Sequence, residues 1–371
     1  MNAPENLAER NAAIETQADS LVDLLRERGH RYFSDFEEGS ISVNLMNMRR
    51  RRYSALYKFA LNSIGKQHNV FVKIPWLEGV EIKRENRPYV APEVDPRIKF
   101  HYFHAALAAI QDHFRNLNDP RFGAIRVLDL IEEHGAFVME EMSAPMLQDL
   151  FATVSRFHVG ARPADLDSVF HNAGAWLGEF HMLDKKDNVK AVNTKRTEFI
   201  ALTHKFIVFL SDATGNRSFF QDVAKRTETY ALGILPENLP LGLRFGDYWM
   251  TNILVGPNNR VTGFDTVACW RVPIYEDIAY FLAGLYATRQ QIASQGLAFD
   301  RHRLAHYEKT FLCGYFGEQT IPVREIQLYQ VLRLLERWSG RATRVGKLSG
   351  VLLNRYFSKV IDDVLQAIND K

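Results

Sequence analysis

The hydrophobic pattern of the chain changes near Pro145, and this change limits the possible folds more than any other feature. Before this position, short apolar runs between turn residues predict about five strands, at Ser42–Met48, Ser54–Leu61, Val70–Ile74, Ala124–Glu132 and Ala136–Met142. After it, apolar residues recur at helical spacing, and helices are expected near 146–158, 165–182, 194–211 and 217–231. The pattern predicts an α+β chain, in which a small antiparallel-sheet lobe precedes a large, mostly helical lobe.

Three segments follow from the same pattern. Residues 1–35 form an amphipathic helix that is expected to pack on the protein, with Gly29 as its end. Residues 36–142 form the N-terminal lobe, with the sheet and a helix from about Arg97 to Phe114. Residues 143–371 form the helical C-terminal lobe.

Composition excludes several classes of protein. The chain has 46 Lys and Arg against 44 Asp and Glu, so it lacks the basic excess of a nucleic-acid binder. Its two cysteines, Cys269 and Cys313, fit neither a disulfide framework nor a zinc site. The polar start, Met1–Asn6, lacks the apolar core of an export signal. The apolar stretch Ile278–Ala287 is shorter than the roughly 20 residues of a membrane span. We therefore expect a globular cytoplasmic protein without a transmembrane segment.

Several polar residues that could take part in catalysis or metal binding lie between Leu243 and Leu282. Asp247 precedes Asn252 by five positions, Asp265 follows a short predicted hairpin, and Asp277 opens an apolar helix. Taken singly, each is a common turn or cap residue. Together they offer the carboxylate and amide oxygens that Mg²⁺ prefers, with a further carboxylate for proton transfer.

This stretch resembles the aminoglycoside phosphotransferase and choline kinase family, the small-molecule branch of the protein-kinase-like fold. The family signature is His-Gly-Asp, four variable residues and Asn, then an Asp after a hairpin and an Asp-hydrophobic-Ala helix start. The resemblance implies a bilobal fold, with Asp247 as the catalytic base and Asn252 and Asp265 as magnesium ligands. Asp277 is then structural support that caps its helix and holds the catalytic loop.

The resemblance extends into the N-terminal lobe. Lys73 lies in Val70–Ile74, where the family and protein kinases keep the lysine that contacts the nucleotide phosphates. Phe137–Met142 resembles the strand that runs into the hinge, so Glu140 and Met142 are implied to contact the adenine through backbone groups. Residues 36–142 are then the nucleotide-binding lobe, and residues 143–371 hold the catalytic loop and the acceptor site.

Two features depart from the family pattern. Phe245 stands where the family has His, a residue that mainly braces the catalytic loop, so we expect an aromatic support there. The segment Met48–Ser54 has four consecutive arginines in place of a glycine-rich loop, and Arg52 and the Ser54 hydroxyl are expected to contact phosphates. The helix that follows offers no clearly placed Glu to pair with Lys73.

The favoured function is an ATP-dependent, magnesium-assisted phosphotransferase that moves the γ-phosphate to a hydroxyl of a small molecule or glycan. The arginine run leans toward an anionic acceptor. The alternative is a catalytically silent pseudokinase that binds a nucleotide or a partner, because the glycine-rich loop is missing and Phe245 replaces His. A Walker-type NTPase is disfavoured, because the chain has no Gly-x-x-x-x-Gly-Lys-Ser/Thr motif.

Overall fold

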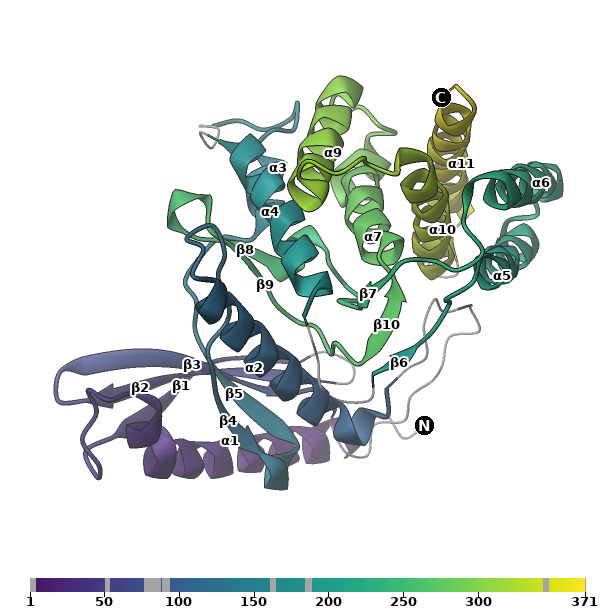
Figure 1. The fold of residues 1–371 in the computed structure, drawn as a ribbon. Helices are drawn as coiled ribbons and strands as arrows, with labels where there is room; N and C mark the ends of the chain where they lie inside the picture. The colour runs from purple at the N-terminus through teal and green to yellow at the C-terminus, as the bar shows by residue number, and fades with distance from the viewer. Residues whose placement is uncertain are drawn as a thin grey trace. The chain divides into compact units, whose positions relative to one another are not determined.

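The computed structural model describes residues 5–50, 54–76, 88, 94–160, 165–183, 189–342 and 347–370 (Figure 1). The chain divides into two compact units. The first unit comprises Met1–Lys83, Val94–Gln111 and Ile125–Ser143. The second unit comprises Arg84–Glu93, Asp112–Ala124 and Ala144–Lys371. The segment Asp112–Ala124 thus belongs with the helical part, although the sequence pattern placed it in the N-terminal lobe.

A five-stranded antiparallel sheet forms the centre of the first unit. Its strands are β1 (Ser42–Arg50), β2 (Ala55–Ser63), β3 (Lys66–Ile74), β4 (Val127–Ile131) and β5 (Ala136–Glu140). They are arranged in the order β1-β2-β3-β5-β4. Ile64 and Gly65 both have positive φ, at 43° and 73°, which suits the two-residue hairpin that joins β2 to β3. The predicted antiparallel sheet is confirmed.

Helix α1 (Glu5–Tyr32) packs on this sheet (Figure 1). Leu21 and Leu25 are fully buried in the core that the helix shares with β2 and β3. The prediction that Gly29 ends the helix is wrong, because α1 continues to Tyr32. A Cβ atom at Gly29 would lie 3.0 Å from Ile41 Cδ1. The glycine therefore permits close packing of the helix against the sheet.

Helix α2 (Lys99–Leu117) follows a short 3-10 turn, η1 (Pro96–Ile98), and a second turn, η2 (Glu132–His134), joins β4 to β5. The apolar face of α2 holds the side chains that its spacing predicted. Phe100, Phe103, Leu107 and Ile110 are all buried.

The second unit is mostly helical, as predicted. Its helices are α3 (Leu147–Ala152), α4 (Leu166–His181), α5 (Arg196–Thr214), α6 (Arg217–Ile234), α7 (Tyr275–Tyr286), α8 (Arg289–Ala293), α9 (Arg301–Phe316), α10 (Val323–Ala342) and α11 (Lys347–Asn369). Over the described residues, no helix combines the length and the apolar character needed to cross a bilayer.

Two small sheets accompany these helices. The predicted hairpin is present as β8 (Ile253–Val255) and β9 (Val261–Gly263). A second sheet joins β6 (Lys190–Ala191), β10 (Trp270–Pro273) and β7 (Leu241–Leu243) in that order. Its strands have two to four residues, too few for an alternating pattern to show in the sequence.

Helices α4 and α9 cross in direct backbone contact. A Cβ atom at Gly174 on α4 would lie 1.9 Å from the carbonyl oxygen of Phe311. A Cβ atom at Gly314 on α9 would lie 1.9 Å from the carbonyl oxygen of His171. Each helix therefore needs a glycine where the other approaches it, and the crossing fixes α4, whose last residue is His181.

Candidate active site

The loop that carries Asp247 is held by the carboxylate of Asp277. This carboxylate accepts hydrogen bonds from the backbone N–H groups of Phe245, at 2.7 Å, and Gly246, at 2.8 Å. Asp277 is fully buried in the first turn of α7. The expectation that Asp277 caps this helix is wrong, because α7 begins two residues earlier at Tyr275 and its N-cap is Ile274. The side chain holds the loop backbone from inside the helix.

A buried chain of polar groups continues from Asp277. His181 Nε2 lies 3.3 Å from Asp277 Oδ2, and His181 Nδ1 lies 2.6 Å from the Tyr315 hydroxyl. Burial pushes the pKa of Asp277 upward, but the hydrogen bond and charge of His181 and the Phe245 N–H hold that pKa below its usual value. Asp277 is therefore ionised when it accepts the two loop N–H groups.

Phe245 is buried in an aromatic cluster. Its ring meets Trp176, Phe180 and Tyr248 edge to face, with centroids 5.9, 5.2 and 4.9 Å away. Its carbonyl oxygen accepts a hydrogen bond from Thr266 Oγ1 at 2.8 Å. At this position the loop is held by ring packing and a backbone contact.

Hydrogen bonds bring Asp247, Asn252 and the segment of Asp265 together. Asn252 Nδ2 donates to the carbonyl oxygen of Asp247 at 2.9 Å, so the amide oxygen is outside that bond. The Asn252 carbonyl accepts from the N–H of Phe264 at 3.0 Å, and Asp265 follows with a φ of +71°. A left-handed φ is uncommon outside glycine, and it turns the chain directly after β9.

The Asp247 carboxylate is exposed and is fixed on one side by Tyr280. The Tyr280 hydroxyl donates to Asp247 Oδ1 at 2.6 Å. Burial raises the pKa of Tyr280 above its usual value, so the hydroxyl keeps its proton and acts as the donor. Sequence reasoning missed Tyr280. The available signal was its place three residues after Asp277, on the same face of α7.

In the first unit, Lys73 lies on β3 between Leu56 and Phe137 of the neighbouring strands. Its Nζ is 4.1 Å from the centroid of the Phe103 ring on α2. Ser54 directly precedes β2. Arg52 lies outside the described residues.

The predicted hinge begins where β5 ends. The Glu140 N–H donates to the Arg126 carbonyl at 2.9 Å, and the Glu141 N–H donates to the Asn69 carbonyl at 2.9 Å. Met142 is the next residue and is partly exposed. Since the Glu140 N–H has a partner, a contact of Glu140 with adenine would have to use its carbonyl oxygen.

Lys58 is a second lysine of this sheet, and sequence reasoning did not single it out. Its Nζ lies 2.6 Å from Glu141 Oε1, and Asn69 donates to the other carboxylate oxygen at 2.8 Å. This ion pair joins β2 to the segment after β5.

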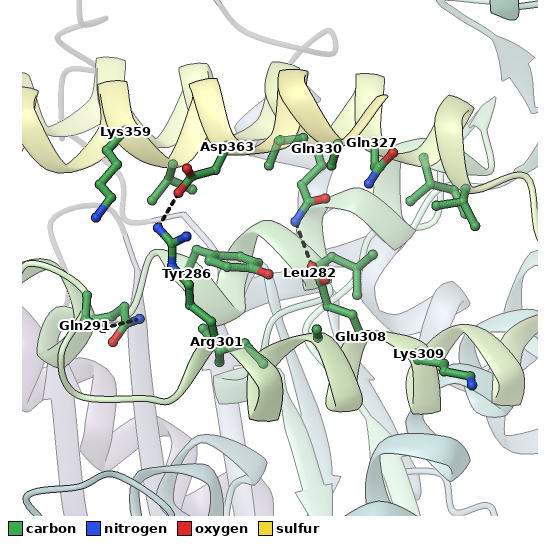
Figure 2. A pocket seen from close by; sticks show the side chains of 18 of the residues that line it. Leu282, Tyr286, Gln291, Arg301, Glu308, Lys309, Gln327, Gln330, Lys359 and Asp363 are labelled. Atoms are coloured by element: carbon green, nitrogen blue, oxygen red, sulfur yellow. Dashed lines mark hydrogen bonds and ion pairs between the residues drawn. The ribbon is translucent and has the colours of Figure 1, made fainter. Parts of the chain in front are cut away.

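A separate cavity of about 660 Å³ lies among helices α7 to α11 (Figure 2). Arg301 and Asp363 form an ion pair at 2.5 Å beside it, and Gln330 donates to Glu308 at 2.9 Å. All its lining residues lie between Leu282 and Ala367, so the cavity is distinct from the loop of Asp247. Among the described residues, no cluster of three or more His, Cys, Asp and Glu forms a metal site. The predicted magnesium pair has one Asp and one Asn.

Comparison with solved structures identifies the fold. The chain is similar to choline kinase from Cryptosporidium parvum Iowa II, with a TM-score of 0.52 and 12% identity over 95% of this chain and 99% of that chain. It is also similar to an ethanolamine kinase from Plasmodium vivax, with a TM-score of 0.50 and 12% identity over 96% of this chain and 90% of that chain. No protein-family model and no curated protein matches the sequence. The predicted fold class is confirmed: the chain has the protein-kinase-like fold of these two proteins.

Proposed function

We propose that the protein transfers the γ-phosphate of ATP to a hydroxyl group of a small-molecule or glycan acceptor. The observation that carries this proposal is the loop of Asp247. Buried Asp277 holds the loop backbone, while the exposed Asp247 carboxylate is oriented by Tyr280. The fold supports the proposal, since the two similar structures are a choline kinase and an ethanolamine kinase.

Asn252 and Asp265 are our candidates for binding Mg²⁺. The Asn252 side chain uses its nitrogen toward the Asp247 carbonyl, which leaves its oxygen as the atom for a cation. An amide oxygen and one carboxylate suit Mg²⁺, which usually takes one or two carboxylates and completes its shell with phosphate and water. When bound, the ion would neutralise charge on the phosphates.

Asp247 is the proposed general base. Its carboxylate accepts the proton of the acceptor hydroxyl as that oxygen forms a bond to the γ-phosphorus. The bond from the γ-phosphorus to the bridging oxygen breaks, and its electron pair leaves with ADP. Tyr280 holds Asp247 Oδ1, so Oδ2 is the proposed proton acceptor.

The nucleotide contacts are proposed for the first unit. Lys73, Arg52 and Ser54 contact the phosphates in this proposal, with Lys73 as the main charge. The Glu140 carbonyl and the Met142 N–H contact the adenine. The Glu140 assignment follows from its N–H being bonded to Arg126.

The test measures nucleotide binding and turnover separately. MgATP should raise the melting temperature, because a ligand bound by the native state alone stabilises it. ADP release should depend on an acceptor from a panel of hydroxylated compounds. Asp247→Asn should lower that release by about 100-fold or more and keep the MgATP-induced stabilisation. Asp212→Asn, at an exposed position of α5, serves as the matched control.

Two outcomes would contradict the proposal. Turnover in Asp247→Asn equal to that of the wild type would remove the base assignment. MgATP binding without phosphoryl transfer to any acceptor would favour the silent pseudokinase.

A further inference from the structure

Three arginines of α10 face α7 at helical spacing. Arg333, Arg337 and Arg341 are four residues apart. Each donates to a backbone carbonyl of α7 or its C-cap: Arg333 to Glu276 at 3.2 Å, Arg337 to Tyr280 at 3.5 Å and Arg341 to Ala287 at 3.0 Å. The row of guanidinium groups therefore follows the helix that holds Asp277 and Tyr280.

Arg333 is neutralised by two carboxylates. It lies 3.1 Å from Glu276 Oε2 and 2.7 Å from Glu336 Oε2. Both Arg333 and Glu276 are fully buried. A buried guanidinium is tolerated when an anion and hydrogen bonds compensate for its lost hydration, and Arg333 meets that condition.

Arg337 and Arg341 each donate to a backbone carbonyl but are compensated less fully than Arg333. Within the described residues, neither forms an ion pair with a carboxylate. Arg337 Nε and Arg341 Nη1 are buried nitrogen atoms without a hydrogen-bond partner. Burial lowers the pKa of Arg337, and the nearby Asp247 and Glu336 carboxylates do not offset it. Burial and repulsion from Arg337 lower the pKa of Arg341 to about 10.

Arg337 also lies beside the catalytic loop. Its Cζ is 3.7 Å from the centroid of the Trp249 ring and 4.2 Å from the centroid of the Tyr280 ring. Trp249 is two residues after Asp247, and Tyr280 donates to the Asp247 carboxylate. The two rings fix the guanidinium next to the group that would take the acceptor proton.

We propose that Arg337, supported by Arg341, binds an anionic group of the acceptor. This inference rests on the proposed phosphotransferase function and narrows it: the acceptor is a hydroxyl compound that also carries a phosphate or a carboxylate. The guanidinium fork matches both groups with paired N–H donors. The bound anion would supply the negative counter-charge that no carboxylate of the described residues provides to Arg337 through an ion pair. A quaternary ammonium acceptor such as choline would instead meet two positive charges.

The first experiment measures anion binding without requiring turnover. The melting temperature of the full-length protein is followed in sodium phosphate, sodium acetate and sodium chloride at equal ionic strength, with and without the analogue Mg–AMP-PNP. Phosphate, acetate or both should stabilise the wild type beyond chloride in a saturable way. The anion that does so separates a phosphate subsite from a carboxylate subsite.

Variants assign the binding to the arginine row. Arg337→Gln should abolish the anion-dependent shift, and Arg337→Lys should retain part of it, because lysine keeps the charge and loses the fork. Arg341→Gln should weaken the apparent anion affinity about tenfold and provides a reading if Arg337→Gln does not fold. Arg324→Gln, exposed on the same helix, should behave as the wild type. The subsite is overturned if the anion-dependent shift in melting temperature is the same in the wild type, Arg337→Gln and Arg341→Gln. It is also overturned if neither anion shifts the melting temperature of the wild type.

The same measurements distinguish failure of the subsite from failure of the proposed function. Stabilisation by Mg–AMP-PNP should be the same in Arg337→Gln and in the wild type. If the analogue stabilises neither protein while the anion shift depends on Arg337, the anion site stands and the nucleotide assignment fails. If the analogue stabilises both and no anion does, the anion subsite fails alone.

Discussion

Asp247 and Asp277 are two carboxylates at the same loop, and their surroundings differ. Asp277 is buried and fully engaged with the loop backbone, so it serves to hold structure. Asp247 is exposed, and the described residues contribute one hydrogen bond to its carboxylate, from Tyr280. A carboxylate that is oriented on one oxygen and open on the other suits proton transfer to and from a ligand.

Removing the Tyr280 hydroxyl should reduce turnover without unfolding the protein. We expect Tyr280→Phe to lower kcat by about 10- to 100-fold. The lost hydrogen bond to a charged group is worth about 1.5–3 kcal/mol, and without it Asp247 is no longer oriented. The KM for the acceptor should change little. Acceptor-dependent ADP release measures both constants, with Tyr102→Phe, at an exposed position of α2, as the control. An unchanged kcat would show that Asp247 needs no such support.

The stability that Asp277 contributes should depend on pH in a specific window. Its pKa in the folded protein is below the usual value, so its contribution is present at neutral pH and is lost as the pH falls through that lowered pKa. Asp277→Asn should lower the free energy of unfolding by about 2 kcal/mol or more at pH 7. The difference between the two proteins should stay constant down to about pH 5 and narrow below about pH 4. Urea denaturation across this range tests it, and narrowing that begins at pH 6 would contradict the assignment.

At the scale of elements, the crossing of α4 and α9 leaves no room for a side chain. We expect Gly174→Ala and Gly314→Ala each to lower the free energy of unfolding by about 3 kcal/mol or more, because backbone atoms would have to move. Gly233 on α6 provides the matched control, since nothing lies within 4 Å of the position that a Cβ atom would take there. Gly233→Ala should raise stability by up to about 1 kcal/mol through helix propensity. Chemical denaturation of the three variants measures the contrast.

Helix α1 should contribute directly to the stability of the first unit. Leu25→Ala should lower the free energy of unfolding by about 2–5 kcal/mol, because Leu25 is fully buried against the sheet. Leu24→Ala should cost less, since Leu24 is only partly buried. Equal losses in the two variants, measured by urea denaturation, would mean that the packing of α1 is not specific.

Elements were predictable from the sequence where the interactions are local. Turn residues indicated the β8–β9 hairpin. The roles of Asp247, Asn252 and Asp265, which lie within about 20 positions, stay predictions that follow from the family resemblance of this stretch. The contact between Asp247 and Tyr280 spans 33 positions. The contact between Tyr280 and Arg337 spans 57 positions and depends on how α7 packs against α10. Such contacts carry no local signal, because any exposed arginine on an amphipathic helix gives the same pattern.

At the scale of the whole molecule, the candidate residues are divided between the two units. Lys73, Ser54, Glu140 and Met142 belong to the first unit, whereas Asp247, Asn252 and Asp265 belong to the second. The change of pattern near Pro145 predicts a boundary between residues 142 and 143, whereas Asp112–Ala124 belongs to the second compact unit. That segment is joined to the rest of the second unit by backbone hydrogen bonds, such as the one from the Gly123 N–H to the Val261 carbonyl. The composition of the segment does not indicate which part of the chain it bonds to.

If Asn252 and Asp265 bind Mg²⁺ as proposed, nucleotide binding should stabilise the protein in a metal-dependent manner. At 100 times its Kd, MgADP should add about 2.7 kcal/mol to the free energy of unfolding. In Asp265→Asn the additional stabilisation by magnesium should disappear, while the stabilisation by ADP in EDTA stays at the wild-type level. Thermal denaturation with and without EDTA measures the two parts. A full magnesium effect in Asp265→Asn would remove that residue from the proposed metal site.

The paired glycines of α4 and α9 also restrict how this protein can recover from mutation. A damaged side-chain contact can be repaired by enlarging or shrinking a neighbour, so suppressor mutations arise at many positions. Where main chain meets main chain, no neighbouring side chain can be trimmed to make space. Revertants selected from Gly174→Ala should consequently be true reversions or general stabilisers distant from the crossing.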